Sequence, residues 1–387
     1  MPYRGVDYYG MDELLTDDER LIRDTFRRFV DEELMPVAAG HFRAGTFPKW
    51  LPRRLGALGA LGAHLEGYGC AGLGAVAYGV IMLELERCDS GFRSFASVQG
   101  SLAMHPIHAF GTEEQKRRWL PRMAAGEAIG CFGLTEPDFG SNPGGMLTTA
   151  RKDNKGWILN GRKMWITNGT VSDVAVVWAK VEDTIKGFLV TKGTPGFSAP
   201  EQKHKWSLRA SVTSELVLQD VRVGESSILP KSGGLKSPLM CLTQARYGIA
   251  WGALGAAHAC FDEVLKYSKQ RIVFERPLAG FQLAQKKLAD MATQITLGQL
   301  IALRLGRLKD EGRLTPAQVS MGKRNNVHIA LEAARVCRDM MGANGVSLEY
   351  QTGRHLCNLE SVYTYEGTHD IHTLAIGQEL TDIAAFK

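Results

Sequence analysis

Residues 132–141 read FGLTEPDFGS and residues 165–169 read WITNG. The first stretch combines backbone-exposing glycines with the hydroxyls of Thr135 and Ser141, and such a loop can offer N–H and O–H donors to a polar ring or a phosphate. A turn that carries these residues without binding a ligand is the alternative, because it would have the same composition. The second stretch ends a predicted strand and could place the face of Trp165 and the hydroxyl of Thr167 beside a planar cofactor, with core packing of Trp165 as the alternative.

The patterns on either side of these stretches predict helices, then strands, then helices. Thr16–Glu19 and Thr112–Gln115 have the form of capping boxes, so the first third is expected to be helical. Short β-rich runs over residues 131–223, separated by Gly, Asn, Asp and Pro, indicate a small antiparallel β domain rather than βαβ units. Helical periodicity returns beyond Gly233, and Thr315-Pro316 marks a helix start. The expected fold class is therefore α+β, mainly α.

Composition excludes several classes of protein. The chain has 387 residues, which is longer than a domain built on a single hydrophobic core. Its residues are 44% hydrophobic and 22% charged, a composition that shows no sign of disorder. Its net charge of +5 is spread along the sequence, which argues against a nucleic-acid partner. Seven cysteines without a C-x-x-C pair indicate free thiols. No leader and no stretch of about 20 apolar residues is visible, so we expect a cytoplasmic protein without membrane insertion.

Residues 67–72, GYGCAG, match the G-x-G-x-x-G pattern of dinucleotide-binding proteins. That pattern requires a buried strand before the glycines and a parallel sheet around them. The preceding residues 55–65 are rich in Gly, Ala and Leu and lie in the helical third. A turn between helices is therefore the preferred interpretation.

Taken together and in this order, residues 132–141 and 165–169 resemble the flavin-binding part of the acyl-CoA dehydrogenases. The resemblance covers nearly the whole chain. Residues 84–100, 241–252 and 359–374 are similar to the glutaryl-CoA-oxidising branch of that family, and the last stretch, LESVYTYEGTHDIHTL, is the most specific. The resemblance implies an N-terminal helical domain over 1–129, a middle antiparallel β domain over 130–235 and a C-terminal four-helix-bundle domain over 236–387.

The resemblance also implies an FAD cofactor and a homotetramer in which a second subunit reaches each FAD. The positions that match flavin contacts are Phe132, Leu134, Thr135, Gly140, Ser141, Trp165, Ile166, Thr167, Thr368 and Phe386. The positions that match the segments reaching a neighbour's cofactor are Arg271, Phe274, Gln282, Asp339, Met340, Met341, Gly342 and Ala343. Three positions depart from the family pattern. Asn142 replaces an Asp, while Glu275 and Ala343 replace glycines, and a carboxylate at Glu275 would be repelled by a pyrophosphate unless it turned to solvent or paired with Arg276.

Glu366 is the candidate general base. It lies between Tyr365 and Gly367, and Thr368 then opens a helix whose apolar residues Ile371, Leu374 and Ala375 are expected to form one buried face. A solvated loop glutamate is the simpler interpretation of that pattern alone. The resemblance changes the balance, because oxidation of an acyl thioester needs a base for the α-proton and an acceptor for the β-hydride.

Arg93 and Ser94 are candidates for binding the distal carboxylate of a dicarboxylyl thioester, since the guanidinium fork suits a carboxylate. A surface arginine is the alternative. The full substrate-binding set implied by the resemblance is Arg93, Ser94, Glu86, Ser141, Arg246, Tyr365 and Gly367. The implied reaction converts glutaryl-CoA to crotonyl-CoA and CO2 and passes electrons to an electron-transfer flavoprotein.

Three other interpretations stay open. A short-chain acyl-CoA dehydrogenase without decarboxylation, or an oxidase that uses O2, would share the fold. A noncatalytic member of the family acting as an assembly partner would lack the chemistry.

His369 and His372 have the spacing of a metal pair, but no third ligand is apparent, so capping or packing is expected and no metal site is predicted.

Overall fold

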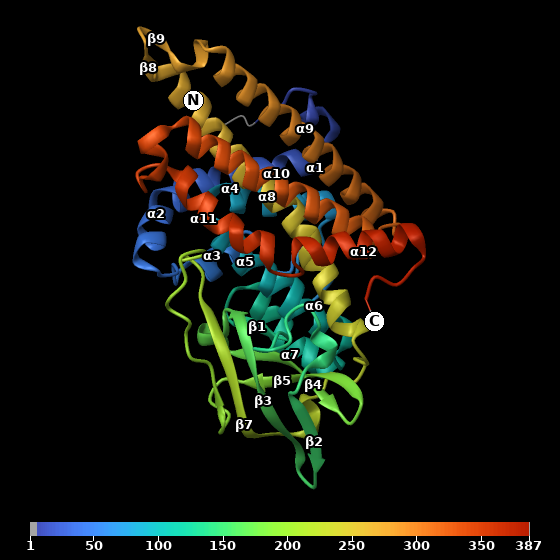
Figure 1. Cartoon of the computed structure of the whole chain (residues 1–387). Helices are drawn as coiled ribbons and strands as arrows, with labels where there is room; N and C mark the ends of the chain where they lie inside the picture. The colour runs from blue at the N-terminus through green and yellow to red at the C-terminus, as the bar shows by residue number, and fades with distance from the viewer. Residues whose placement is uncertain (1–5, 387) are drawn as a thin grey trace.

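The structure, a computed structural model, describes residues 6–386 and consists of a helical body with a β-rich part at one end (Figure 1). The N-terminal helices are α1 (Asp17–Phe29), η2 (Val30–Leu34), α2 (Met35–Ala44), α3 (Leu51–Ala57), α4 (Ala75–Cys88), α5 (Ser90–Ser97), η3 (Val98–Met104), α6 (His105–Phe110) and α7 (Glu113–Ala124). Both predicted capping boxes are confirmed. The hydroxyl of Thr16 accepts from the N–H of Glu19, and Gln115 pairs in the same way with Thr112.

The β-rich part is one curled sheet. Its strands are β1 (Gly130–Gly133), β2 (Thr149–Asp153), β3 (Gly156–Thr167), β4 (Val174–Val181), β5 (Thr184–Thr191), β6 (Phe197–Ser198) and β7 (Thr213–Val223). The prediction of an antiparallel sheet holds for four pairings, β2–β3, β3–β7, β4–β5 and β6–β7. It is wrong for β1 and β2, which run parallel to β4. Tight turns force only consecutive strands to be antiparallel, and β4 is reached from β1 and β2 through longer connections.

The C-terminal part returns to long helices. Its elements are α8 (Lys236–Gln270), β8 (Ile272–Val273), β9 (Arg276–Pro277), α9 (Gln282–Asp310), α10 (Pro316–Met340), α11 (Gln351–Thr364) and α12 (His369–Thr381). Helices α8 to α11 pack along one another as the predicted four-helix bundle, and α12 lies against α10. The Thr315 hydroxyl caps α10 as the sequence predicted. Among the described residues all seven cysteines are free.

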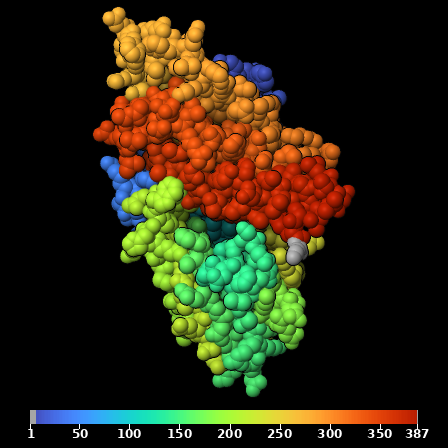
Figure 2. Space-filling view, in the orientation of Figure 1, coloured from blue at the N-terminus to red at the C-terminus, as the bar shows by residue number. Residues whose placement is uncertain are grey.

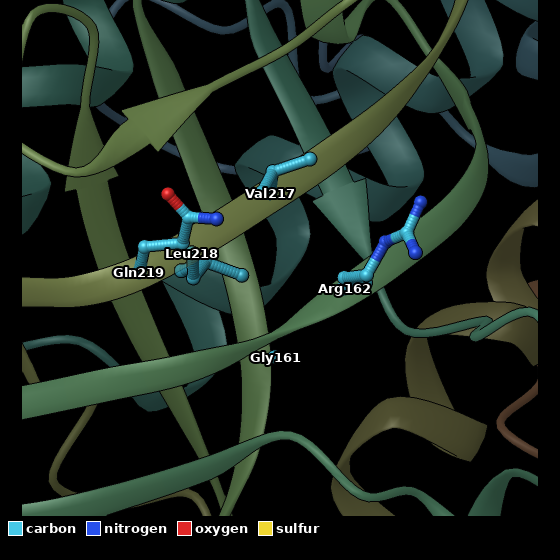
Figure 3. Close-up of a pocket in the computed structure, with 5 residues that line it drawn as sticks. All are labelled: Gly161, Arg162, Val217, Leu218 and Gln219. Carbon is cyan, nitrogen blue, oxygen red and sulfur yellow. The ribbon is translucent and has the colours of Figure 1, made fainter.

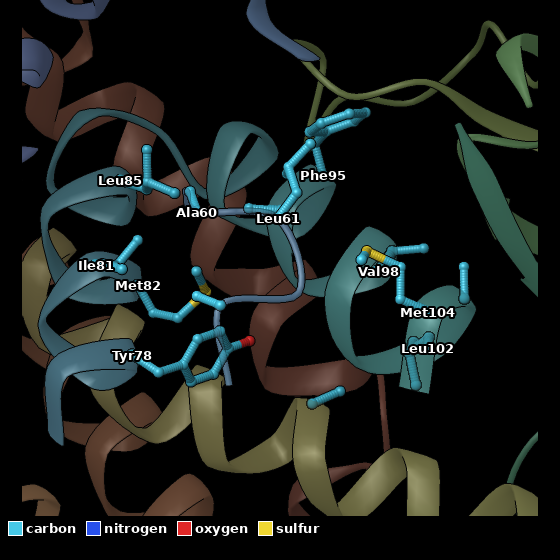
Figure 4. Packing of buried hydrophobic residues seen from close by; sticks show 14 of the residues in the cluster. Ala60, Leu61, Tyr78, Ile81, Met82, Leu85, Phe95, Val98, Leu102 and Met104 are labelled. Carbon is cyan, nitrogen blue, oxygen red and sulfur yellow. The ribbon is translucent and has the colours of Figure 1, made fainter. Parts of the chain in front are cut away.

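Buried apolar side chains form three clusters, one in the N-terminal helices, one in the bundle and one in the sheet. Figure 4 shows the first, in which Tyr78, Met82 and Leu85 of α4 face Phe95 and Val98. Burying each such side chain contributes about 1.5–3 kcal/mol. This packing holds α4 and α5 in fixed positions relative to each other.

Helix α8 approaches α4 closely because it presents glycines. A Cβ at Gly255 would collide with the backbone carbonyl of Leu83, and a Cβ at Gly252 would run into the Glu86 carboxylate and lie 3.1 Å from Nε of Arg93. The missing side chain at Gly252 therefore leaves the space that the Glu86 and Arg93 side chains occupy.

Residues 67–72 form a loop between α3 and α4, and no strand lies among residues 6–66 before them. Gly67 and Gly69 have φ values of 76° and 80°, which only glycine adopts without strain. The prediction of a turn between helices is confirmed.

Candidate active site

Glu366 lies in the short loop that joins α11 to α12. The hydroxyl of Thr368 accepts from the N–H of Ile371 at 3.2 Å, so the predicted helix start is confirmed. Glu366 has a φ of 52° and Gly367 a φ of 97°, two successive left-handed residues that turn the chain sharply. A Cβ at Gly367 would lie 2.9 Å from Nε2 of His372, so the position has little room for any other residue.

The predicted apolar buried face of α12 is wrong. Leu374 is 40% exposed, while the buried residue of the helix is His372. Residues two positions apart point about 200° apart around a helix, so a helix that buries His372 turns Leu374 outward.

The carboxylate of Glu366 is in a partly desolvated setting. Its Oε2 is buried and has no hydrogen-bond partner among residues 6–386, although the residue as a whole is half-buried. Burial raises the pKa of Glu366 above its ordinary value, while the charges of Arg93, Arg246 and Lys323 oppose that rise. A carboxylate with a raised pKa and an unpaired oxygen suits a general base.

The backbone of the same loop is held by side chains. Nε of Arg246, on α8, donates to the carbonyl oxygen of Glu366 at 2.7 Å. Burial lowers the pKa of Arg246, and the Glu366 charge opposes this. Nζ of Lys323, on α10, donates to the carbonyl of Gly367 at 2.9 Å. The sequence interpretation did not select Lys323. Its signal was its position on the buried side of α10, four residues from both Val319 and Val327.

Arg93 is fully buried, so the interpretation as a surface arginine is wrong. Its Nε donates to Oε2 of Glu86 at 2.6 Å, and its Nη2 donates to the hydroxyl of Tyr365. Its Nη1 and the second oxygen of Glu86 have no partner among the described residues. Burial would lower the pKa of Arg93, but Glu86 and Tyr365 raise it on balance, so the guanidinium stays charged. Ser94 is buried beside it. One guanidinium nitrogen is thus left for a further acceptor.

An ion pair pins the glycine-rich loop after β1. Nζ of Lys163, on β3, donates to Oε1 of Glu136 at 2.8 Å and to the carbonyl of Leu134 at 3.2 Å. Glu136 also accepts from the N–H groups of Leu147 and Thr148. Burial lowers the pKa of Lys163 to about 8, and the charge of Glu136 opposes this. The sequence interpretation assigned no role to this pair, because the sequence separation hides the contact.

Trp165 projects from β3 where the pairing with β7 shifts register between Lys163 and Ile166. Its φ is 63° and it is 62% exposed, so the interpretation as core packing is wrong. The left-handed residue produces a bulge that turns the indole away from the buried face. The N–H of Met164 donates to the carbonyl of Thr135 at 2.8 Å and so joins the two stretches that were singled out first.

The remaining predicted residues fall into two distant groups. Phe132, Leu134, Thr135, Gly140, Ser141, Ile166 and Thr167 lie on β1, on β3 and in the loop after β1, whereas Thr368 caps α12 and Phe386 lies at the C-terminal end of the described chain. Figure 2 shows a recess between the C-terminal helices and the β-rich part, at the bottom of which earlier residues of the chain are visible. The other group lies at the far end of the helical body, on the β8–β9 hairpin and its flanks and at the end of α10 with the turn that follows (Figure 1): Arg271, Phe274, Gln282, Asp339, Met340, Met341, Gly342 and Ala343.

The β8–β9 hairpin is exposed within one chain. Phe274 is 87% exposed, and Glu275 follows it with a φ of 66°. Glu275 turns to solvent, whereas Arg276 lies over the ring of Phe281, 3.9 Å from its centroid. Asp339 forms an ion pair with Lys287 at 2.6 Å. One chain therefore does not bring this group to Glu366.

A surface hollow of about 440 Å³ lies elsewhere, between β3 and β7 (Figure 3). It is lined by Gly161, Arg162, Val217, Leu218 and Gln219, none of which is a predicted site residue. His369 stacks on Tyr363 with ring centroids 4.5 Å apart. In the part of the chain that the structure describes, no His, Cys, Asp or Glu group could hold a metal ion, and none of its helices has the length and apolarity to cross a membrane.

Comparisons with known proteins agree with this architecture. Profiles of the acyl-CoA dehydrogenase N-terminal, middle and C-terminal domains match residues 16–127, 131–221 and 232–381. The human mitochondrial short-chain specific acyl-CoA dehydrogenase is 35% identical over 373 residues, which cover 95% of this chain and 90% of that protein. The chain belongs to the acyl-CoA dehydrogenase family.

Solved structures of the family include two informative neighbours. A glutaryl-CoA dehydrogenase from Mycobacterium smegmatis in complex with FADH2 is 55% identical, with a TM-score of 0.98 and full coverage of both chains. A butyryl-CoA dehydrogenase from Megasphaera elsdenii is 34% identical, with a TM-score of 0.90, covering 95% of this chain and 98% of the other. Acyl-CoA dehydrogenases depend on FAD, and this chain has the family fold throughout.

The residues present fit such a cofactor. Trp165 offers an exposed indole beside the loop that Lys163 and Glu136 hold in place. Open space surrounds the position that a Cβ would take at Gly140, so a ligand can approach the backbone there. These features suit a planar ring system with a polar edge.

Proposed function

We propose that this chain catalyses the FAD-dependent oxidation of glutaryl-CoA between Cα and Cβ, with decarboxylation to crotonyl-CoA and CO2 and transfer of electrons to an electron-transfer flavoprotein. The observation that carries the proposal is the environment of Arg93, a fully buried arginine with one unpaired guanidinium nitrogen. The identity of 55% to a glutaryl-CoA dehydrogenase supports the same assignment.

Charge balance favours an anionic acyl group over an apolar one. Arg93, Arg246 and Lys323 surround the carboxylates of Glu86 and Glu366, and burial lowers the pKa of Lys323 to about 7. When all five groups are ionised, one positive charge is in excess. Unpaired charge is costly in a desolvated site. The distal carboxylate of glutaryl-CoA would neutralise that excess and occupy the free Nη1 of Arg93, with the Ser94 hydroxyl beside it.

Glu366 then has two tasks. It removes the α-proton, which is possible because its Oε2 is not engaged by the protein. The backbone N–H of Glu366 makes no backbone hydrogen bond among the described residues and is available to polarise the thioester carbonyl. FAD, when bound by the loop 132–141, Trp165, Thr167 and Thr368, supplies the acceptor for the β-hydride.

Loss of CO2 follows from the product of that step. The distal carboxylate is now on the γ-carbon, next to the new Cα=Cβ double bond that is conjugated with the thioester, so the bond between the γ-carbon and the carboxylate breaks with the electron pair spreading toward the carbonyl oxygen. Protonated Glu366 returns its proton to the same carbon and yields crotonyl-CoA. Glu86 and Tyr365 anchor two nitrogens of Arg93 and thereby orient the third.

The test is an asymmetric loss of activity. Arg93→Met is expected to lower kcat/KM for glutaryl-CoA by about two orders of magnitude, because a charge-assisted hydrogen bond and the matching charge disappear. The kcat/KM for butyryl-CoA should stay within about tenfold of wild type, since that substrate needs the same base and cofactor but no cation. CO2 release per glutaryl-CoA oxidised measures decarboxylation directly.

Arg87→Met is the matched control, because Arg87 is also a buried arginine of the N-terminal helices but pairs with Glu84 and Asp31. It should leave the ratio of the two kcat/KM values unchanged. Equal losses for both substrates in Arg93→Met would return the protein to a general short-chain acyl-CoA dehydrogenase. Rapid reoxidation by O2 without a flavoprotein acceptor would indicate an oxidase, and purification without flavin would support a noncatalytic role.

A further inference from the structure

Three backbone carbonyls, one in the last turn of α11 and two in the loop around Glu366, accept hydrogen bonds from a single ammonium group. Nζ of Lys323 lies 3.5 Å from the carbonyl oxygen of Tyr363, 3.2 Å from that of Tyr365 and 2.9 Å from that of Gly367. Lys323 is 1% exposed and enters from α10, at a distance in sequence from the loop it binds. Lysine is almost never fully buried unless its ammonium is satisfied, and here the loop satisfies it.

The loop has few other bonds that would hold its shape. The only backbone hydrogen bonds that tie its two ends among the described residues run from Tyr365 N–H to Ser361 and from His372 N–H to Thr368. Between them, Glu366 and Gly367 are both left-handed, an arrangement that is strained for a glutamate. The carbonyl of Glu366 itself is taken by Arg246 from α8. Lys323 and Arg246, from two different helices, therefore hold the three successive carbonyls of residues 365–367.

The geometry separates holding the loop from binding the substrate. An ammonium has three N–H donors, and those of Lys323 all find backbone oxygens, so none is left for a ligand carboxylate. Nη1 of Arg93, in contrast, is unpaired. The charge of Lys323 still acts on Glu366 and lowers the pKa of that carboxyl, against the larger effect of burial.

We propose that Lys323 is a positioning residue for the base: by clamping the carbonyls of Tyr363, Tyr365 and Gly367 it fixes where the Glu366 carboxylate stands. This inference rests on the proposed role of Glu366. Because its N–H donors are taken by backbone oxygens, Lys323 acts through the loop.

The experiment compares Lys323→Met with Lys309→Met in the flavin-containing full-length protein. Lys309 is a matched lysine on α9, because burial lowers its pKa as well, but its ammonium donates to Gln244 at 2.6 Å and lies over Tyr247. Stopped-flow absorbance of the flavin at pH 5–9, with glutaryl-CoA as the reductant, gives the reduction rate, the apparent substrate affinity and the acid limb of the pH profile. Hydrogen exchange of the peptide covering residues 361–369 reports the loop independently of turnover.

In Lys323→Met we expect the reduction rate to fall by about a hundredfold, the cost of misplacing a catalytic group by roughly 1 Å, while substrate affinity changes less than about threefold. The acid limb should move to higher pH, because removal of a nearby cation raises the pKa of Glu366. Amides of the loop should exchange faster. Lys323→Gln, which keeps amide donors but no charge, should restore part of the rate while leaving the acid limb shifted.

A wild-type acid limb and wild-type loop exchange in Lys323→Met would overturn the proposal. If both Lys323 variants fail to fold with flavin while Lys309→Met folds, Lys323 is a folding residue and the proposal is equally wrong. Glu366→Gln separates this failure from failure of the proposed function: if that variant still reduces the flavin, the base itself is misassigned, whatever Lys323 does.

Discussion

At the scale of single residues, Glu366 stands out because one oxygen of its carboxylate is buried without a hydrogen-bond partner among the described residues. The adjacent backbone carbonyls are held by the side chains of Arg246 and Lys323 instead of by backbone hydrogen bonds. An unsatisfied buried acceptor costs about 1–3 kcal/mol, so it persists where a ligand or a reaction uses it. The same reasoning applies to Nη1 of Arg93.

Glu366→Gln should therefore leave the flavin bound and abolish its reduction by glutaryl-CoA, because an amide cannot accept the α-proton. In the wild type, activity should fall on the acid side with an apparent pKa above the ordinary value of a glutamate, since burial raises the pKa of Glu366 and only the ionised form is a base. Anaerobic rapid mixing measures both. Bleaching at a rate near that of the wild type would place the base elsewhere.

Residues such as Lys323 and Trp165 mark the limit of what the sequence predicts at this scale. Lys323 is buried because the loop of another helix supplies its acceptors, and no local pattern encodes that partner. Trp165 is exposed because a left-handed residue shifts the register of β3. Periodicity arguments assume regular backbone, and sites are where backbone departs from it.

At the scale of elements, local signals predicted more. The caps at Thr16, Thr112, Thr315 and Thr368 all start helices where the sequence indicated, because a cap and its acceptor lie within one turn. The parallel pairing of β1 with β4 joins strands far apart in the chain, and the sequence held no local sign of it. The outward turn of Leu374 likewise depends on the contact of α12 with α10.

The β8–β9 hairpin offers a prediction of its own. Glu275 is exposed with a φ of 66°, at a position proposed to approach a neighbour's FAD. Glu275→Gly should tighten FAD binding by up to about tenfold, because it removes a negative charge near the pyrophosphate. Titration of the apoprotein with FAD measures the change.

Glu182→Gly is the control for that prediction. Glu182 is also exposed, with a φ of 52°, but lies in the turn between β4 and β5. It should relieve comparable strain without altering the Kd for FAD. Equal effects of the two substitutions on that Kd would show that strain alone is responsible and would remove the hairpin from the cofactor site.

At the scale of the whole molecule, the proposed centre is assembled from all three parts of the chain. Arg93 comes from the N-terminal helices, Trp165 from the sheet and Glu366 from the C-terminal bundle. Glycines of α8 let the first and third parts approach closely enough for Glu86 and Arg93 to lie beside Glu366. Loosening this interior should therefore affect stability and chemistry together.

Buried histidines make that interior sensitive to acid. Burial lowers the pKa of His258 to about 3 and that of His105 to about 4, and Nε2 of His258 has no partner among the described residues. In the unfolded chain both titrate near 6.5, so between that pH and their folded pKa values the unfolded state binds more protons. The stability that their neutral forms provide is complete above about pH 6.5 and is lost progressively as the pH falls.

His258→Gln should remove one of these protons from the unfolding equilibrium. Between pH 6.5 and pH 5 each such histidine costs the wild type about 2 kcal/mol of unfolding free energy, so the variant should lose about that much less over the same interval. Urea unfolding followed by circular dichroism, at fixed protein and FAD concentrations, measures the difference. His204→Gln, at an exposed loop position, should keep the slope of the wild type. If the slopes of His258→Gln and wild type coincide, the acid sensitivity arises from carboxylates, and His258 is protonated as easily in the folded protein as in the unfolded chain.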